Sequence, residues 1–492
     1  MNKIKANRVL IVGGGITGLS AAYQLEQHSK QSGVPLEVTL LESSNRIGGV
    51  VQSLHHGENE ANLSKYVIET GADSFITSKP WALDLCRELN LDDQLIETQP
   101  HNRRTFVVRN GKLIQIPTGF VLLAPSRFWP IARSRILSWS GKLRLAMDLL
   151  LPRRKCETDE SVASFVTRRM GRETLDRIVQ PLLGGIYTAN PEHLSIRATM
   201  PQFVDWEKQH RSLIQAVRKH QNQRASDSSG ARFDLFVTPR GGMADLIHET
   251  AKRLGNNCIQ TNKKVIQIAP SEKNSWKIDC QDPVYYETDA VILAVPSVHA
   301  APLVKSFDDS LSNQLHAIPY ASTAIAILQY HRDQIGKHIS GFGILIPKTE
   351  GLSILGCSFL SEKFSARGPK DHIIIRVFIG GALQPELLAQ DDHDLCQLAH
   401  KEVSSLLEIT QKPIWSTLYR HHESMPQYTI GHQSRVQNIE EHMTKWRGLE
   451  LAGNAYHGIG IPDCIHSGRE AAKRTLNYLQ ARSNETNHIQ QA

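Results

Sequence analysis

The sequence predicts an α/β fold built around a parallel sheet that binds a dinucleotide, and three observations support this prediction. Residues 9–12 form an apolar run that suits a buried strand, because strands covered on both faces read as continuous hydrophobic segments. A glycine-rich turn and a helical pattern of small and apolar residues follow directly. A second apolar run, residues 36–41, ends at the acidic residue Glu42. Strand, glycine turn, helix and strand in this order form a dinucleotide-binding unit.

The glycine turn has the chemistry of a pyrophosphate site. Gly13 permits a tight turn, Gly15 lets the backbone approach an anion, and Gly18 allows the helix to pack closely on the sheet. The amides and dipole at the start of the helix also favour an anion. We therefore expect the cofactor to contact Gly13, Gly14, Gly15, Ile16, Thr17 and Gly18. Taken alone, the motif also fits a turn that only needs glycine for positive φ angles.

The residues after the second strand indicate which dinucleotide binds. Glu42 stands at the spacing expected for an acid on ribose hydroxyls, and its charge disfavours a 2′-phosphate. A second basic, glycine-rich turn follows, which a nicotinamide-binding unit does not require. This extra turn favours FAD. The cofactor contacts expected here are Glu42, Ser43, Arg46, Gly48, Gly49 and Val50.

These blocks resemble the flavoproteins with two dinucleotide-binding domains, a class that includes monoamine, polyamine and porphyrinogen oxidases. Residues 69–75, 180–187 and 451–465 narrow the resemblance to the protoporphyrinogen oxidase and coproporphyrinogen III oxidase family, which is FAD-dependent and uses oxygen. The match extends from about Arg8 to Gln480. The resemblance implies a Rossmann-like FAD domain, an α+β substrate domain and a helical insertion.

The resemblance also implies further contacts to a noncovalent FAD. Independently of it, Pro462 predicts a helix that begins near Ile461 and points its dipole at the flavin. Asp73 is a candidate for orienting the reacting edge, although an aspartate that caps the next helix fits it as well. Cys464 falls inside the helix and is interpreted as a buried apolar residue, not as a covalent attachment point. The implied contacts are Gly71, Ala72, Asp73, Ser74, Val265, Trp415, Gly453, Gly460, Ile461 and Pro462.

The activity implied by the resemblance is a six-electron oxidation of a porphyrinogen, late in haem biosynthesis. A hydride passes to flavin N5, which is itself the catalytic group, and O2 accepts the electrons to give H2O2. Arg104 and Thr105 stand where relatives bind a propionate, although the register here stays open. We expect protoporphyrinogen IX as the substrate and leave coproporphyrinogen III open, because the arginines permit either. The product would pass to a ferrochelatase.

Two other functions remain as alternatives. An amine oxidase shares the nucleotide motifs but usually requires an aromatic cage for the amine. A catalytically silent scaffold would keep the fold without its cofactor. The intact Gly15, Gly18, Glu42 and Gly49 argue against the scaffold, because a protein that binds no FAD has no need for a pyrophosphate site.

The order of patterns predicts a discontinuous domain organisation. Residues 1–80, 236–310 and 430–492 are expected to form the FAD-binding domain, and residues 81–118 and 311–429 the substrate-binding domain. Residues 119–235 form the helical insertion. Asn110 and Gly111 predict a type I′ hairpin, and the β-rich runs between residues 322 and 420 predict an antiparallel sheet.

Composition excludes several other classes of protein. The net charge of +7 is too small, and the basic residues too dispersed, to indicate a nucleic-acid partner. Seven scattered cysteines without a C-x-x-C pair argue against disulfides and a metal site, so we expect a cytoplasmic protein without a metal. No apolar run approaches the roughly 20 residues of a membrane span, and the first strand leaves no room for a signal peptide.

One segment of the chain has a composition that suits peripheral contact with a membrane. Residues 120–155 mix tryptophans and leucines with many basic side chains. This mixture suits a helix pair that lies on an anionic membrane surface, as in monotopic members of the family. Helices that cover a substrate chamber show the same pattern, with their apolar face turned inward. The sequence leaves both interpretations open.

Overall fold

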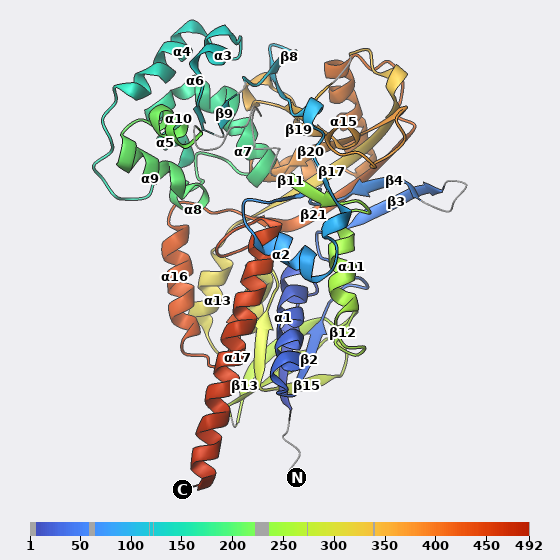
Figure 1. The fold of residues 1–492 in the computed structure, drawn as a ribbon, viewed down its shortest axis with the longest axis vertical. Coiled ribbons are helices and arrows are strands. Elements are labelled where there is room, and N and C mark those ends of the chain that lie inside the picture. Colours follow the sequence, from blue (N-terminus) through green and yellow to red (C-terminus); the bar gives the residue numbers. More distant parts are fainter. Residues whose placement is uncertain are drawn as a thin grey trace.

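Two large sheets and a group of helices make up the computed structural model, which describes residues 6–58, 64–117, 119–121, 123–221, 236–272, 274–337 and 340–491. A five-stranded sheet lies at the end of the molecule that carries both termini (Figure 1). A seven-stranded sheet and the helices α3 to α10 lie toward the opposite end. The two large sheets therefore follow one another along the long axis of the molecule.

The five-stranded sheet is the predicted parallel sheet. All of its pairings are parallel, and its strands come from the beginning, the middle and the end of the chain. In sheet order, the strands are β12 (Ile259–Gln260), β2 (Leu36–Leu41), β1 (Asn7–Val12), β16 (Ala290–Leu293) and β22 (Leu449–Leu451). The two strands predicted around the first glycine turn are thus confirmed, and segments remote in sequence complete their sheet.

Helices cover both faces of this sheet, because successive side chains of a strand point to opposite sides. Val9 and Ile11 pack against one group of helices, and Leu10 and Val12 against the other. The first group is α1 (Ile16–Ser32), α2 (Trp81–Glu88), α11 (Ala244–Lys252) and α17 (Ile461–Gln491). The second face is covered by α12 (Ser297–Val304), α13 (Asp309–His316), α16 (His432–Met443) and the small antiparallel sheet β13 (Val265–Ser271), β14 (Ser275–Cys280) and β15 (Tyr285–Thr288).

The seven-stranded sheet is almost entirely antiparallel, as predicted. Its one parallel pairing, between β18 and β7, attaches the predicted hairpin to the sheet. Asn110 and Gly111 both have positive φ, as the predicted type I′ turn requires. In sheet order, the strands are β21 (Trp415–Pro426), β17 (Tyr320–His331), β20 (His372–Gly380), β19 (Ile354–Phe359), β18 (Gly343–Leu345), β7 (Thr105–Arg109) and β8 (Lys112–Gln115).

The two faces of this sheet have different roles. One face packs on the helix α15 (Asp392–Leu407). The other face packs on the hairpin of β3 (Ser53–Glu58) and β4 (Ser64–Glu69) and on the short helix α14 (Leu360–Lys363). A three-stranded sheet of β5 (Phe75–Ile76), β11 (Phe236–Pro239) and β6 (Leu95–Glu97) lies between the large sheets. The second face is therefore the one turned toward the glycine motifs.

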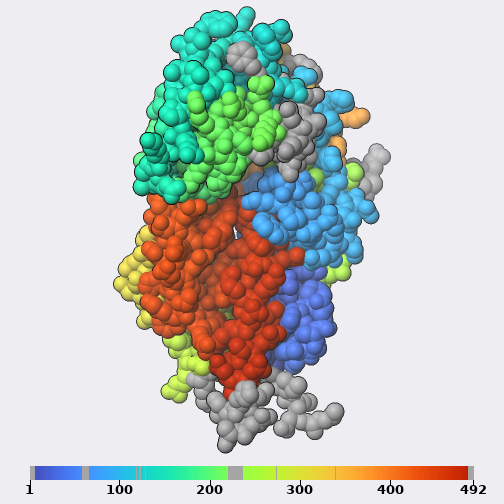
Figure 2. All heavy atoms as spheres, turned by 60° about the vertical axis from the view of Figure 1, so that its left-hand side comes forward, coloured from blue at the N-terminus to red at the C-terminus, as the bar shows by residue number. Residues whose placement is uncertain are grey.

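The helical group lies at the end of the molecule remote from the termini (Figure 2). Residues 120–121 and 124–125, which the sequence placed in a predicted helix pair, instead form the short strand pair of β9 (Phe120–Val121) and β10 (Ala124–Pro125). Within the described residues, no helix has the length and apolar character to cross a bilayer. The helices are α3 (Phe128–Arg133), α4 (Trp139–Ala146), α5 (Val162–Met170), α6 (Arg172–Thr174), α7 (Gln180–Tyr187), α8 (Ile196–Thr199), α9 (Pro201–His210) and α10 (Leu213–Gln221).

Candidate active site

Three glycine turns lie in contact with one another: the first at Gly13–Gly15, the second at Gly48–Gly49 and the third at Gly71. The Gly48 amide donates to the Gly14 carbonyl at 2.8 Å. A Cβ added to Gly49 would lie 3.5 Å from the Gly15 Cα, and one added to Gly71 would lie 2.0 Å from the Val50 carbonyl oxygen. The structure thus brings three motifs together that the sequence separates by tens of residues.

The first turn leaves open space where an anion would bind. Gly13 has a φ of +110°, and a Cβ there would lie 2.6 Å from the Ala294 carbonyl oxygen, so only glycine fits. A Cβ at Gly15, in contrast, would meet no protein atom within 4 Å. Gly15 caps α1 without a side-chain hydrogen bond, which leaves the first amides of the helix available to a ligand. Protein atoms therefore fill the space beside Gly13, whereas the space beside Gly15 is open to a ligand.

Glu42 organises the neighbouring end of the site. Its Oε2 accepts from the Gly14 amide at 2.7 Å, and its Oε1 accepts from the Ser44 amide at 2.8 Å. The Glu42 carbonyl accepts from the Lys263 amide at 2.8 Å, two residues before the buried Val265. Ser43 and Arg46 are exposed beside it, and Arg46 donates to the Gly49 carbonyl at 2.8 Å. The residues predicted to bind ribose and adenine therefore lie together.

The C-terminal motif meets the first turn through α17. A Cβ added to Gly468 would lie 2.2 Å from the Thr17 carbonyl oxygen, so the two helices pack backbone to backbone. Gly460, Ile461 and Pro462 form the beginning of α17, as predicted. The Gly453 amide donates to the Ser467 hydroxyl at 2.9 Å. The two ends of the chain thus share one site.

Tyr428 fixes the loop that leads into α17. Its hydroxyl donates to the Asn454 carbonyl at 2.6 Å and accepts from the Gly458 amide at 2.8 Å. At the start of the helix, Asp463 pairs with Lys79 at 2.5 Å. Burial raises the pKa of the neighbouring Cys464 to about 12, so this thiol stays protonated at neutral pH. A protonated, buried thiol is a poor nucleophile.

Asp73 lies in a charged cluster that the sequence did not predict. Its Oδ1 accepts from Lys363 of α14 at 2.8 Å, and its Oδ2 pairs with Arg376 of β20 at 3.1 Å. Arg376 also donates to the Gly71 carbonyl. Burial alone would raise the pKa of Asp73, but the two cations and the Ser74 hydroxyl hold that pKa well below its usual range. Asp73 is therefore ionised and ties the seven-stranded sheet to the third glycine turn.

A second buried pair lies beside this cluster. Arg367 approaches Glu69 to 3.5 Å, and both side chains have no exposed surface. Glu69 also accepts from the Ser53 hydroxyl and the Met243 amide. Burial raises the pKa of Glu69 to about 7, although Arg367 and these hydrogen bonds oppose the shift. The joint cluster holds three cations, Lys363, Arg367 and Arg376, against the carboxylates of Glu69 and Asp73.

His421 of β21 contacts the backbone of the third glycine turn. Its Nε2 lies 2.7 Å from the Thr70 carbonyl, which can only accept, so Nε2 carries the proton. Burial lowers the pKa of His421, against the opposing effect of that hydrogen bond. His421 is thus a neutral side chain that holds the backbone next to Gly71.

Comparisons with known proteins match this arrangement over nearly the whole chain. A family model described as flavin containing amine oxidoreductase matches residues 16–476. The coproporphyrinogen III oxidase of Bacillus subtilis (strain 168) is 31% identical and covers 96% of this chain and 98% of its own. The protoporphyrinogen oxidase of Homo sapiens is also 31% identical, over 95% of this chain and 98% of its own. The chain belongs to the flavin-containing amine oxidoreductases.

Solved structures agree with the fold. The "putative protoporphyrinogen oxidase from Exiguobacterium sp. 255-15" has a TM-score of 0.84 and 27% identity, and covers 97% of this chain and all of its own. A UDP-galactopyranose mutase has a TM-score of 0.71 at 14% identity, which shows a shared fold alone. The predicted α/β flavoprotein fold with an FAD site is therefore confirmed.

The residues present fit an FAD molecule. The open space at Gly15 and the uncapped start of α1 suit a pyrophosphate, and Glu42 lies where the ribose would follow. Between the turn at Gly15 and the charged cluster of Asp73 lie Gly49, Gly71 and the start of α17. These residues are thus the ones that would hold the family's cofactor.

Three predicted site residues lie outside this set. Trp415 stacks on His56 with ring centroids 4.8 Å apart, six residues along β21 from His421, a distance of roughly 20 Å at the rise of a strand. Arg104 is exposed and precedes β7. Thr105 is buried three strands from Arg376, on the same face of the sheet. His421, and not Trp415, is the residue of β21 that lies beside Gly71, so the contact between Trp415 and FAD stays a prediction.

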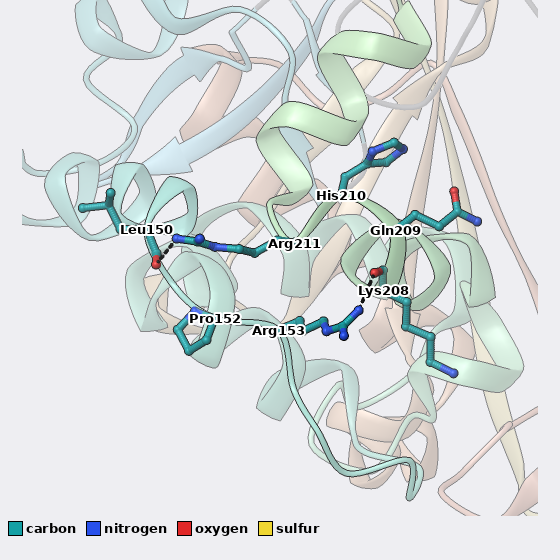
Figure 3. Close-up of a pocket in the computed structure, with 7 residues that line it drawn as sticks. All are labelled: Leu150, Pro152, Arg153, Lys208, Gln209, His210 and Arg211. Carbon is teal, nitrogen blue, oxygen red and sulfur yellow. Dashed lines mark hydrogen bonds between the residues drawn. The ribbon is translucent and has the colours of Figure 1, made fainter.

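The hollows described on the surface lie apart from this site. One of about 540 Å³ is lined by Leu150 and by residues of α9 and its end, where Arg211 donates to the Leu150 carbonyl at 2.7 Å (Figure 3). Another, of about 860 Å³, lies between the β7–β8 hairpin and α3. None of the residues that line either hollow belongs to a glycine motif, so we assign neither of them to the flavin.

Proposed function

We propose that this protein oxidises a porphyrinogen to the corresponding porphyrin with FAD as its noncovalent cofactor, as a late step of haem biosynthesis. The convergence of the Gly15, Gly49 and Gly71 turns with the start of α17 carries this proposal. The relatives named porphyrinogen oxidases support it further, since they match over about 95% of the chain. The protonated, buried Cys464 supports noncovalent binding.

The side chains of the protein bind and orient, and the cofactor performs the redox chemistry. Bound FAD supplies the acceptor for a hydride from the macrocycle, with O2 as the final acceptor and H2O2 as the product. The amides of α1 hold the pyrophosphate, and Glu42 holds the ribose. Asp73 orients the segment 70–74 through Lys363 and Arg376.

The charge of the buried cluster offers a site for substrate carboxylates. Three cations stand against Glu69, Asp73 and the nearby Asp245, but burial raises the pKa of Glu69 to about 7 and also raises that of Asp245, so the negative charge is incomplete near neutral pH. A buried excess of positive charge favours a nearby anion. We therefore propose that Lys363 and Arg376, on the face turned toward the glycine motifs, help to attract the propionates, which the sequence assigned to Arg104 and Thr105.

Two porphyrinogens are candidates for the preferred substrate. The sequence interpretation is protoporphyrinogen IX, and the identity to the human protoporphyrinogen oxidase supports it. The equal identity to the Bacillus subtilis coproporphyrinogen III oxidase favours coproporphyrinogen III as the second candidate. Either porphyrin would then pass to a ferrochelatase.

Porphyrin fluorescence and peroxide formation test the proposed function. Purified protein with its flavin spectrum recorded is mixed with each porphyrinogen in air, and the ratio of the two kcat/KM values identifies the substrate. Formation of porphyrin and H2O2 above the rate without enzyme is expected. If neither porphyrinogen reacts while putrescine yields H2O2, the protein is an amine oxidase and the proposal is wrong.

We also propose the discontinuous domain division, with residues 1–80, 236–310 and 430–492 as the FAD-binding domain. Residues 81–118 and 311–429 are the substrate-binding domain, although α2 and α13 at the start of these ranges pack on the five-stranded sheet, and residues 119–235 are the helical insertion. The origin of the five parallel strands supports this division, and so does the hairpin at Asn110 that joins the later sheet. Residues 222–235 of the insertion lie outside the described residues.

The helical group supports a proposal of peripheral membrane contact. Trp129, Trp139, Leu143 and Leu150 are between 70% and 75% exposed, and all lie on or beside α3 and α4. The 860 Å³ hollow next to α3 is lined by four basic side chains and by apolar residues; the basic ones are Arg109, Lys112, Arg133 and Arg135. Exposed tryptophans beside basic groups suit the interface of an anionic bilayer.

Vesicle sedimentation tests this contact. The protein should sediment with phosphatidylglycerol vesicles and much less with phosphatidylcholine vesicles. The double variant Trp139→Ser with Leu143→Ser should reduce sedimentation, whereas Val34→Ser, which changes an exposed apolar residue remote from these helices, should not. Equal sedimentation of the wild type and the double variant would contradict the proposal.

A further inference from the structure

Two histidines and an aspartate meet at one end of the seven-stranded sheet. His331 is the last residue of β17, and it pairs directly with His372, the first residue of β20. Asp371 precedes His372 in the chain. One ligand atom from each of the three residues lies within 4.8 Å of the others. This cluster lies outside the set of residues that fits FAD.

The imidazole of His372 is held in place, and its Nδ1 atom faces Asp371. The side chain is 9% exposed, and Tyr66 packs edge-on against its ring with centroids 5.8 Å apart. The Nδ1 atom is buried and makes no well-aligned hydrogen bond within the described part of the chain, although the Asp371 Oδ1 lies 3.0 Å away. The buried Nδ1 is thus held only by a poorly aligned contact with an exposed carboxylate, and a cation bound by both groups would satisfy it better.

The other two groups can complete a metal site. His331 is exposed, and its ring lies 4.1 Å from the ring of His372 between centroids. One nitrogen of His331 accepts from the Gln334 amide, so the other nitrogen carries the proton, and binding of a metal ion by His331 would replace this hydrogen bond. Asp371 is 69% exposed, so its carboxylate can move by the short distance that metal bonds of about 2 Å require.

The nearby charges do not exclude a cation. Arg332 follows His331, but its guanidinium pairs with the Glu362 carboxylate at 2.5 Å and also donates to the Lys370 carbonyl. Its charge is therefore largely offset by Glu362. The carboxylate of Asp371 itself adds one negative charge to the two neutral imidazoles, which is the balance found in many sites for divalent ions.

We propose that His331, Asp371 and His372 bind a divalent transition-metal ion of the zinc class. Two imidazoles and one carboxylate are ligands that zinc(II) prefers, and a water molecule would take the fourth position of a tetrahedron. The bound ion would join the ends of β17 and β20 at the edge of the molecule. This site is independent of the proposed function, because no residue of the glycine motifs takes part in it.

Zinc binding to the FAD-loaded protein tests the proposal. The protein is treated with EDTA, desalted and titrated with ZnCl2 in a calorimeter. His331→Ala and Asp371→Asn each remove an exposed ligand and should weaken the tightest zinc site by roughly tenfold or more. His316→Ala removes an exposed histidine of α13 and should leave that site unchanged. Thermal unfolding without metal confirms that each variant is folded.

Copper spectroscopy provides a second readout. With one equivalent of Cu²⁺, the electron paramagnetic resonance spectrum of the wild type should show coupling to two nitrogen nuclei, and that of His331→Ala should show coupling to one. If the wild type binds no zinc below millimolar concentration, the proposal is wrong. It is equally wrong if His331→Ala binds zinc as tightly as the wild type does.

Discussion

Gly468 lies against the Thr17 carbonyl so closely that a Cβ on Gly468 would stand 2.2 Å from the oxygen. Because neither backbone can yield without moving its helix, this contact fixes the distance between α1 and α17. The start of α1 carries the pyrophosphate turn, and the start of α17 carries the C-terminal motif. One glycine therefore sets the separation of two halves of the flavin site.

Gly468→Ala should push the two helices apart. An added methyl group in a packed interior typically costs 1–3 kcal/mol, and here we expect about 2 kcal/mol or more, because the neighbour is backbone. The FAD content after gel filtration should fall together with the midpoint of thermal unfolding. Gly255→Ala is the control, since its nearest neighbour is the end of the Glu26 side chain, 3.3 Å away. Full FAD occupancy in Gly468→Ala would contradict this prediction.

Gly15→Ala tests the pyrophosphate turn with little effect on the fold. A Cβ at Gly15 would meet no protein atom within 4 Å, and its φ of −73° suits alanine. The unfolding midpoint of the apo-protein should thus stay the same. A methyl group in the open space would obstruct the approach of a phosphate, so FAD should bind at least roughly tenfold more weakly. Fluorescence titration of apo-protein with FAD measures this, and unchanged affinity would show that the anion binds elsewhere.

The pair of Asp73 and Lys363 should be strongly coupled. Asp73→Asn leaves Lys363 buried with a neutral partner, and breaking such a pair commonly costs about 3–5 kcal/mol. Lys363→Met should destabilise the protein as well, but the double variant should lose less than the sum of both. The exposed pair of Glu249 and Lys252 serves as the control, with a coupling of at most about 0.5 kcal/mol. Additive shifts of the unfolding midpoint at Asp73 and Lys363 would contradict the coupling.

The sequence predicted the local parts of the site well, because each depends on residues near one another in the chain. The turn after β1, the acid at the end of β2 and the start of α17 at Ile461 are all where the patterns place them. Asn110 and Gly111 have the predicted backbone conformation for the same reason. These predictions rest on the positive φ angles that glycine permits, on the preference of proline for the first turn of a helix, and on the spacing of apolar residues.

The charged cluster around Asp73 and the histidine cluster could not be predicted from local sequence patterns, because each joins residues that are remote in the chain. Asp73 and Arg376 meet only because β20 lies inside a sheet whose strand order does not follow the chain. His331 and His372 meet because two long strands pair in one particular register, and a shift by one residue would separate their side chains. The absence of paired cysteines in the sequence therefore carries no information about this cluster of histidines.

The buried Glu69 should make stability depend on pH. Burial raises its pKa from 4.5, the ordinary value of an exposed glutamate, to about 7 in the folded protein, so the folded state holds a proton that the unfolded state has lost. Between these two pH values, stability should fall as pH rises, by up to about 3 kcal/mol, and above pH 7 the contribution should level off.

Glu69→Gln isolates this effect, because glutamine stays neutral at every pH and keeps an oxygen that can accept from the Ser53 hydroxyl and the Met243 amide. Near pH 5 the variant and the wild type should unfold at similar temperatures. Toward pH 8 the variant should become the more stable of the two, since only the wild type must bury a carboxylate beside Arg367. Thermal unfolding from pH 5 to pH 8 measures the difference. Parallel curves over this range would mean that Arg367 keeps Glu69 ionised throughout, and that the ion pair outweighs the cost of burial.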